Sequence, residues 1–222
     1  MDVGLLAAHI SFDRHGGANY SKHLLGQMLE KRGHDATYYT LNFSDENDAP
    51  ASRAYEIVEL ELEGPGLAGK AGDLLRQLRG IVSDHDVFHV YIPGPIPLVV
   101  LAAKGTGTPV VTTLNGYTPF CTNSSLMSHG CWEECSLRDK IVHGRMGPQG
   151  KAGQEAMARH VFNHFAGMRL MDHVDRHICL SPAVADIYEG AGVDGSLLDV
   201  IPNMVDPGME VPDISGDGIP HV

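Results

Sequence analysis

Residues 3–41 read VGLLAAHISFDRHGGANYSKHLLGQMLEKRGHDATYYTL, an apolar run, a glycine loop, an amphipathic stretch and a second β-rich run. The run Val3–Ala8 is typical of a strand that is buried on both faces. The stretch Ala18–Arg32 has helical periodicity, and Gly33 supplies a helix stop. Its apolar stripe consists of Leu24, Leu25, Met28 and Leu29. These residues therefore predict a strand, a helix and a second strand in succession.

The same alternation continues along the chain. Further strands are predicted at Ala36–Leu41, Tyr55–Leu60, Val87–Tyr91, Pro109–Leu114, Arg176–Leu180 and Leu198–Ile201. Further helices are predicted at Gly69–Ser83, Ile96–Lys104, Gln154–Val174 and Ala183–Glu189. Strands that alternate with helices of this length favour a parallel sheet with right-handed crossovers. We therefore predict an α/β, Rossmann-like sheet with helices on both faces.

We expect one domain over residues 1–206, with two departures from the regular pattern. Residues 115–150 are rich in turn formers and carry three cysteines, which predicts an irregular Cys-rich insert. Residues 207–222 contain Pro207, Pro212 and Pro220 and read as a linker or tail.

The net charge of −12 over 222 residues restricts the class of partner. Such a chain repels a phosphate backbone, so we expect no general nucleic-acid binding. The acidic surface fits either adaptation to high salt or an ordinary acidic cytoplasmic protein. Neither a signal peptide nor an apolar run of roughly 20 residues is visible. We therefore expect a cytoplasmic location, in which cysteines are thiols or metal ligands more often than disulfides.

The loop after the first strand ends in Gly16-Gly17, directly before the predicted helix. Two glycines here let the backbone approach a ligand, and a helix N-terminus offers free N–H groups to a phosphate or a sugar. The alternative is a tight turn that serves backbone geometry alone. The dinucleotide fingerprint G-x-G-x-x-G is absent, which disfavours NAD binding.

Six motifs in order resemble family 4 glycosyltransferases, which have the GT-B fold. They are Gly16-Gly17, Gly33-His34, Asp86-Val87-Phe88-His89-Val90, Thr108-Pro109-Val110-Val111-Thr112-Thr113-Leu114, Cys179-Leu180-Ser181, and Val200-Ile201-Pro202-Asn203-Met204-Val205-Asp206. The resemblance implies a retaining transferase with two Rossmann-like domains, of which this chain is the N-terminal, acceptor-side one. It also implies a nucleotide-sugar donor, a sugar or lipid-linked acceptor, and a C-terminal donor-binding domain that this chain lacks.

The resemblance and the positions after the strands together nominate a binding edge. Its candidate donor- and acceptor-binding residues are His9, Ser11, Arg14, Gly16, Gly17 and Asn115. Asn115 stands where the family usually has His, and an amide orients hydroxyls but takes no proton near neutrality. We name Asn115 as the catalytic candidate. The departure also leaves open a non-catalytic binding or scaffold module that has kept the fold.

Cys121, Cys131 and Cys135 lie within fifteen residues of the insert. Three thiolates and one histidine can hold a structural Zn²⁺, with His129 and His143 nearest in sequence. A disulfide and reduced thiols remain alternatives. Cys179, in a predicted buried strand, is expected in the core.

Other charged residues have an ordinary interpretation and a functional one. His173 and His177 are expected to be solvated or to cap elements. A basic patch of Arg138, Lys140, Arg145 and Lys151 fits either a solvated loop or contact with an anionic acceptor or lipid at the inner face of the membrane.

Overall fold

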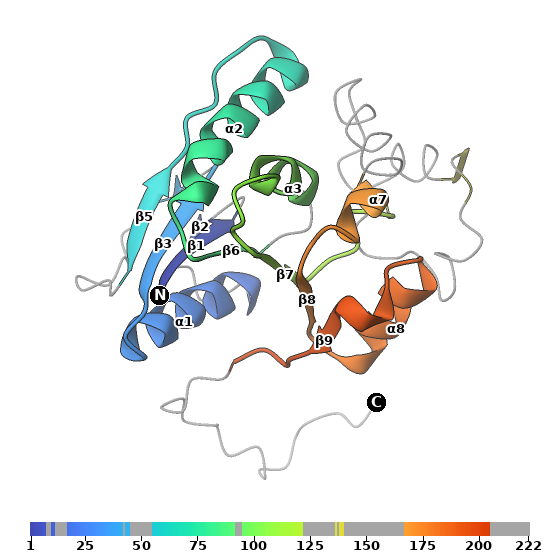
Figure 1. The fold of residues 1–222 in the computed structure, drawn as a ribbon. Helices are drawn as coiled ribbons and strands as arrows, with labels where there is room; N and C mark the ends of the chain where they lie inside the picture. Colours follow the sequence, from blue (N-terminus) through green and yellow to red (C-terminus); the bar gives the residue numbers. More distant parts are fainter. Residues whose placement is uncertain are drawn as a thin grey trace, which may run out of the picture.

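The computed structural model describes residues 1–7, 10–11, 17–41, 43–44, 55–91, 95–121, 136, 138–139 and 167–204. In these ranges it shows a Rossmann-like α/β fold (Figure 1). The strands are β1 (Asp2–Ala7), β2 (Ile10–Ser11), β3 (Asp35–Thr40), β4 (Phe43–Ser44), β5 (Glu56–Glu59), β6 (Val87–Val90), β7 (Val110–Leu114), β8 (Arg176–Cys179) and β9 (Leu198–Val200). The helices are α1 (Gly17–Lys31), α2 (Gly66–Ser83), α3 (Ile96–Ala103), α7 (Met168–Met171), α8 (Pro182–Gly190) and the 3₁₀ turn η2 (Gly195–Leu197).

Seven of the described strands form one sheet in the order β5-β3-β1-β6-β7-β8-β9. All six neighbouring pairs are parallel. Strand β1 lies inside the sheet, with Val3 opposite Ala36 on one side and Val87 on the other. The predicted parallel sheet is therefore confirmed. The short parallel pair of β2 and β4 was not predicted, because two-residue strands have no detectable periodicity.

Helices cover both faces of this sheet, as predicted (Figure 1). On one face, α1 packs over a cluster that includes Leu5, Ala36 and Tyr38. On the other face, α2, α3, α7 and α8 contribute to a larger cluster around Leu6, Phe88 and other apolar side chains. The alternation of inward and outward positions along each strand separates the two cores.

The predicted boundaries agree with the described elements to within about three residues at either end. The predicted helix Gln154–Val174 is an exception, because only its last turns, including α7, lie in the described ranges. Cys179 is fully buried in the core, as expected. Among the described residues, no helix is both long and apolar enough to cross a bilayer.

For His177 the solvated alternative is wrong, whereas the capping alternative agrees with the contact between its ring and the carbonyl at the end of α7. This residue is fully buried rather than solvated, whereas His173 is exposed as expected. Strand register puts His177 opposite Thr112, whose hydroxyl lies 2.6 Å from the His177 Nδ1. The other ring nitrogen lies 3.0 Å from the Met171 carbonyl. Two interior partners satisfy the imidazole, so burial leaves no polar atom of it unpaired.

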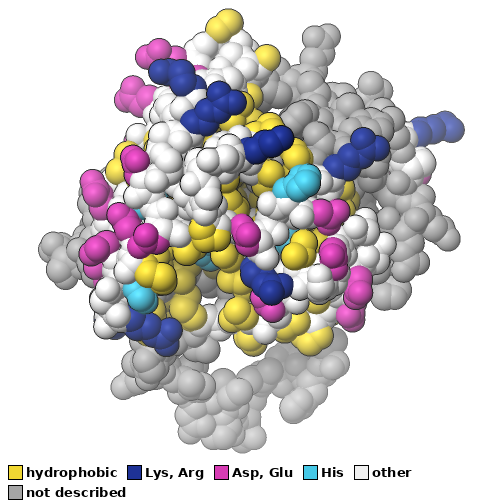
Figure 2. All heavy atoms as spheres, in the orientation of Figure 1, with side chains coloured by type: hydrophobic (Ala, Val, Ile, Leu, Met, Phe, Trp, Pro, Cys, Tyr) yellow, Lys and Arg dark blue, Asp and Glu magenta, His cyan; other side chains and the backbone are white. Residues whose placement is uncertain are grey.

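Charge is unevenly distributed on the face shown in Figure 2. Acidic side chains lie on the side of β3 and β5 and again toward α8, and Lys and Arg side chains spread over the region of α2, α3 and α7 between them. A chain that carries a net charge of −12 thus has a local basic region on this face.

Candidate functional site

The topology of the sheet singles out one position for a ligand. From β1 the chain proceeds outward through β3 to β5, and then returns to β6 and proceeds the other way to β9. Adjacent strands β1 and β6 therefore start connections in opposite directions. In parallel α/β sheets, ligands bind beyond the carboxyl ends of the strands at such a switch point. The candidate site is this carboxyl edge, next to Ala7 and Tyr91.

Two side chains from different elements meet at the switch point. The Tyr91 backbone N–H donates to the Leu6 carbonyl (2.9 Å), which places Tyr91 directly after β6 and beside β1. The Lys22 Nζ lies 6.0 Å from the centroid of the Tyr91 ring. Both residues are 3% exposed. Such a cation above an aromatic face is electrostatically favourable, more so when desolvated.

Helix α1 holds Lys22 in place. The Tyr38 hydroxyl donates to the Lys22 carbonyl (2.5 Å), which ties the second turn of α1 to strand β3. The neighbouring side chain of Ser21 shares a hydrogen bond with the Tyr91 side chain. Gly26 lets the helix approach closely, because a Cβ there would lie 2.6 Å from the Tyr55 ring. The lysine is thus presented by a helix fixed at several points.

Burial lowers the pKa of Lys22 to about 8. Since this pKa still lies above 7, the ammonium form predominates at neutral pH. The switch point therefore holds a positive charge in a poorly solvated place, where an anion gains more from it than at the surface. A buried lysine with a displaced pKa at a ligand edge is a functional candidate.

Asn115 follows β7 at the same carboxyl edge and is half-buried. The loop behind it is fixed by α8, because the Tyr188 hydroxyl donates to the Gly116 carbonyl. Tyr188 also packs against Tyr117 and Phe120, with ring centroids 6.0 and 5.1 Å away. The Asn115 amide can donate and accept hydrogen bonds but has no proton to exchange near neutrality.

Strand β8 ends next to β7, and Ser181 begins α8 there. The Ser181 hydroxyl accepts a hydrogen bond from the Val184 N–H at 3.3 Å. The serine oxygen therefore caps the helix.

The other predicted binding residues are only partly visible. Gly17 is the first residue of α1, as expected for the end of the glycine loop. Ser11 lies in β2, where its backbone pairs with Ser44. His9, Arg14 and Gly16 lie outside the described residues. Their place at the edge stays a prediction.

The predicted zinc cluster also remains untested in its main part. Cys121 carries a free thiol and packs half-buried against the larger core. Cys131 and Cys135 lie outside the described residues. Among the described ones, no group of three or more His, Cys, Asp or Glu side chains could hold a metal ion. Of the basic patch, Arg138 is exposed, and the other three residues lie outside the described ranges.

Sequence reasoning missed Lys22 and Tyr91. A helical wheel contains the signal for the lysine, because Lys22 shares a stripe with Leu25 and Leu29 at i+3 and i+7. A lysine on an apolar stripe is unusual enough to deserve a functional explanation. Tyr91 has no such signal in the sequence, since it reads as the last residue of an apolar strand.

Comparison with solved structures shows the same fold at low identity. HepE from Anabaena, solved with UDP-glucose, superposes with a TM-score of 0.59 at 14% identity, over 93% of this chain and 44% of its own. WaaG, a glycosyltransferase involved in lipopolysaccharide biosynthesis, gives 0.54 at 13%, over 95% and 48%. LpCGTa, solved with UDP, gives 0.52 at 14%, over 93% and 55%. The chain thus spans about half the length of these structures.

No curated protein sequence matches the chain. The model of one family, Glycosyltransferase Family 4, matches residues 15–208. This match begins at the glycine loop and runs beyond β9, so it includes every strand of the main sheet except β1. On this evidence the chain belongs to Glycosyltransferase Family 4.

Proposed function

We propose that this chain is the acceptor-side half of a retaining glycosyltransferase that uses a nucleotide-sugar donor. The observation that carries the proposal is the family match over residues 15–208, on a fold whose switch point presents a buried lysine. HepE and LpCGTa, which share this fold, were solved with UDP-glucose and UDP. The proposal extends that kind of ligand to this chain.

In the proposed reaction, the carboxyl edge supplies charge and position rather than a base. A nucleotide sugar carries a diphosphate, and its negative charge grows on the leaving group as the glycosidic bond breaks. The Lys22 ammonium lies where it would stabilise that charge in a low-dielectric setting. Asn115 would orient a sugar hydroxyl through its amide. Lys22 belongs to α1 and Asn115 directly follows β7, so both positions are held by the fold, which reduces reorganisation during the reaction.

The proposed enzyme has two domains, of which this chain supplies one. Residues 1–206 would form the acceptor-side domain, and 207–222 would lead to a donor-binding domain that completes the active site. The acceptor would be a sugar or a lipid-linked sugar. Contact with the cytoplasmic face of a membrane would use the basic patch that includes the exposed Arg138.

One observation favours a second candidate, a binding module without catalysis. Asn115 stands where the family resemblance leads one to expect His at the rim. If the histidine is required for transfer, the chain would bind a sugar or a nucleotide without turning it over. The two functions differ in turnover and not in binding.

The test uses the gene product at its natural length and a panel of UDP-, GDP- and ADP-sugars with mixed sugar and lipid-linked acceptors. Released nucleotide is measured first, and the product's anomeric configuration is then determined by NMR. Acceptor-dependent nucleotide release with retained configuration supports the proposal. Inverted configuration contradicts the retaining mechanism. Saturable binding of a nucleotide sugar without release on any acceptor favours the binding module.

A further inference from the structure

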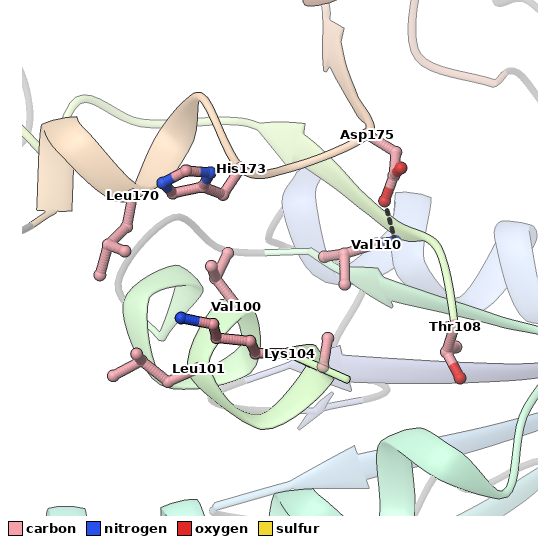
Figure 3. A pocket seen from close by; sticks show the side chains of 9 residues that line it. Val100, Leu101, Lys104, Thr108, Val110, Leu170, His173 and Asp175 are labelled. Atoms are coloured by element: carbon pink, nitrogen blue, oxygen red, sulfur yellow. Dashed lines mark hydrogen bonds between the residues drawn. The ribbon is translucent and has the colours of Figure 1, made fainter. Parts of the chain in front are cut away.

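A pocket of about 290 Å³ opens at the opposite edge of the sheet from the switch point. It lies among α3, the start of β7, α7 and the segment before β8 (Figure 3). Val110 and Asp175 mark the amino ends of β7 and β8. A ligand bound there would not reach the carboxyl edge, so the pocket is separate from the transfer site. This inference does not depend on the proposed function.

The lining of the pocket combines an apolar floor with ionisable groups. Its aliphatic residues are Val100, Leu101, Ala103, Val110 and Leu170. Its polar residues are Lys104, Thr108, His173 and Asp175. Leu101 is 39% exposed, which is unusual for a leucine on a helix that packs against two others. A bound aliphatic group would cover part of that surface and gain the corresponding hydrophobic free energy.

The basic groups lie on one side of the pocket. In Figure 3 the amino group of Lys104 extends toward the region below the His173 ring, beside Leu170. Within the described ranges, neither Lys104 nor His173 makes an ion pair or a side-chain hydrogen bond. An ammonium donates in three directions, and an imidazole offers at least one N–H in either protonation state. This side therefore presents donors suited to an anion.

The acidic group lies on the other side. The Asp175 carboxylate accepts a hydrogen bond from the Val110 N–H (2.7 Å), and the Asp175 N–H donates to the Val110 carbonyl (3.0 Å). These two bonds hold the carboxylate at the start of β7, on the far side of Val110 from His173 (Figure 3). Its other oxygen makes no hydrogen bond with any described residue, so it can accept one from a ligand. Opposite charges thus face the pocket from its two ends.

The volume limits the size of the ligand. A cavity of about 150 Å³ accommodates benzene, so a pocket about twice as large fits on the order of ten non-hydrogen atoms. This is near the lower limit of small-molecule sites. A purely anionic ligand would meet repulsion from Asp175, and a purely cationic one would meet repulsion from Lys104.

From this arrangement we propose that the pocket binds a short aliphatic molecule with an anionic group at one end and a hydrogen-bond-donating group, such as an ammonium, at the other. The anionic end contacts Lys104 and His173, the donor end contacts Asp175, and the chain between them lies on the aliphatic floor. Separation of the two polar ends distinguishes this ligand from an ordinary α-amino acid, which has both charges at one end.

The test compares four probes by calorimetry or NMR titration of the whole chain. The first, 6-aminohexanoate, carries both charges at opposite ends, and its isomer leucine has the same formula with both charges at one end. Hexanoate and hexylamine carry one charge each. We expect 6-aminohexanoate to bind at least about tenfold more tightly than any of the other three, as one additional charged hydrogen bond would give. If 6-aminohexanoate binds no more tightly than leucine, the proposal is overturned.

Titrations of pocket variants test whether the ligand binds in this pocket. Lys104→Met should weaken the binding of 6-aminohexanoate and hexanoate by about tenfold. It should not weaken the binding of hexylamine, because it removes the like charge that repels the amine. Ala103→Leu, which fills the pocket, should abolish saturable binding. Lys70→Met removes an exposed lysine of α2 outside the pocket and serves as the matched control. Thermal melting shows that each variant is folded. Unchanged binding by a folded Ala103→Leu variant overturns the assignment.

Discussion

His89 and His177 are buried in the sheet, each beside a threonine of β7. The His89 Nε2 lies 2.8 Å from the Thr113 hydroxyl, and His177 pairs with Thr112 on the other face. Burial lowers the pKa of His89 to about 4, and burial also lowers the pKa of His177. Both imidazoles are therefore neutral in the folded protein at pH 7. The fold depends on that neutral form.

The lowered pKa of His89 predicts the direction of a pH dependence. An unfolded histidine takes up its proton near pH 6.5, whereas the folded one does so near 4. The contribution to stability is complete above about pH 6.5 and is lost as the pH falls toward 4. The loss is on the order of 3 kcal/mol in the free energy of unfolding. Urea denaturation at pH 7 and pH 4.5 measures it.

Two variants separate the contribution of His89 to the pH dependence from that of other groups. His89→Gln should flatten the pH dependence and leave the part that His177 and other titrating groups contribute. His173→Gln, at an exposed histidine, should reproduce the wild-type slope. If His89→Gln retains the full slope, another group is responsible.

Single residues also mark the limits of the sequence predictions. His177 was expected to be solvated or to cap an element, and its register opposite Thr112 shows that it is buried. Its ring does contact the carbonyl that ends α7. Lys22 escaped notice because a lysine on a helix is normally solvated. In both cases the decisive contact comes from a residue distant in sequence, which is Thr112 for His177 and Tyr91 for Lys22. Local patterns do not reveal such contacts.

Among the elements, β1 and β6 pack closely because of one glycine. Gly4 of β1 lies opposite Phe88 of β6. A Cβ at Gly4 would approach the Phe88 ring to 2.5 Å and the His85 ring to 2.6 Å. Phe88 is itself fully buried, so it has little room to move.

Gly4→Ala should therefore lower the free energy of unfolding by about 2 kcal/mol or more, as overpacking of a dense core does. Gly72→Ala in α2 is the matched control, since no atom lies within 4 Å of the added methyl. This helical substitution should stabilise the protein by roughly 0.5–1 kcal/mol. Thermal and chemical denaturation of both variants measure the contrast. A Gly4→Ala variant as stable as Gly72→Ala would refute the packing argument.

Most elements were predictable because their periodicity is strong. The helix α2 buries Leu74, Leu78 and Val82 along one stripe, as its spacing indicates. The strand β7 is almost continuously β-branched and lies between two other strands. The pair β2 and β4 was not predictable, because two-residue strands are defined by tertiary contact.

At the scale of the whole molecule, the sheet has two different ends. The carboxyl edge has Lys22, Tyr91 and Asn115 at or beside the switch point, and the amino edge has the pocket of Lys104 and Asp175. The carboxyl edge is the proposed site of sugar transfer. The pocket at the amino edge is a separate site. The family itself could be predicted, because six short motifs occur in the family's order along nearly all of residues 1–206. The charged groups at each edge of the sheet could not be predicted, because they come from side chains that only the fold brings together.

The central claim is that the carboxyl edge, with its buried lysine, takes part in sugar transfer. The most direct measurement is nucleotide release by the natural-length gene product, compared between wild type, Lys22→Met, Lys22→Arg and Lys70→Met. We predict that Lys22→Met lowers kcat at least about tenfold, because the variant removes the positive charge that would stabilise the leaving group. Thermal melting of each variant checks that it is folded. Lys22→Arg should retain part of the rate, and Lys70→Met all of it. A folded Lys22→Met enzyme with wild-type kcat would contradict the claim.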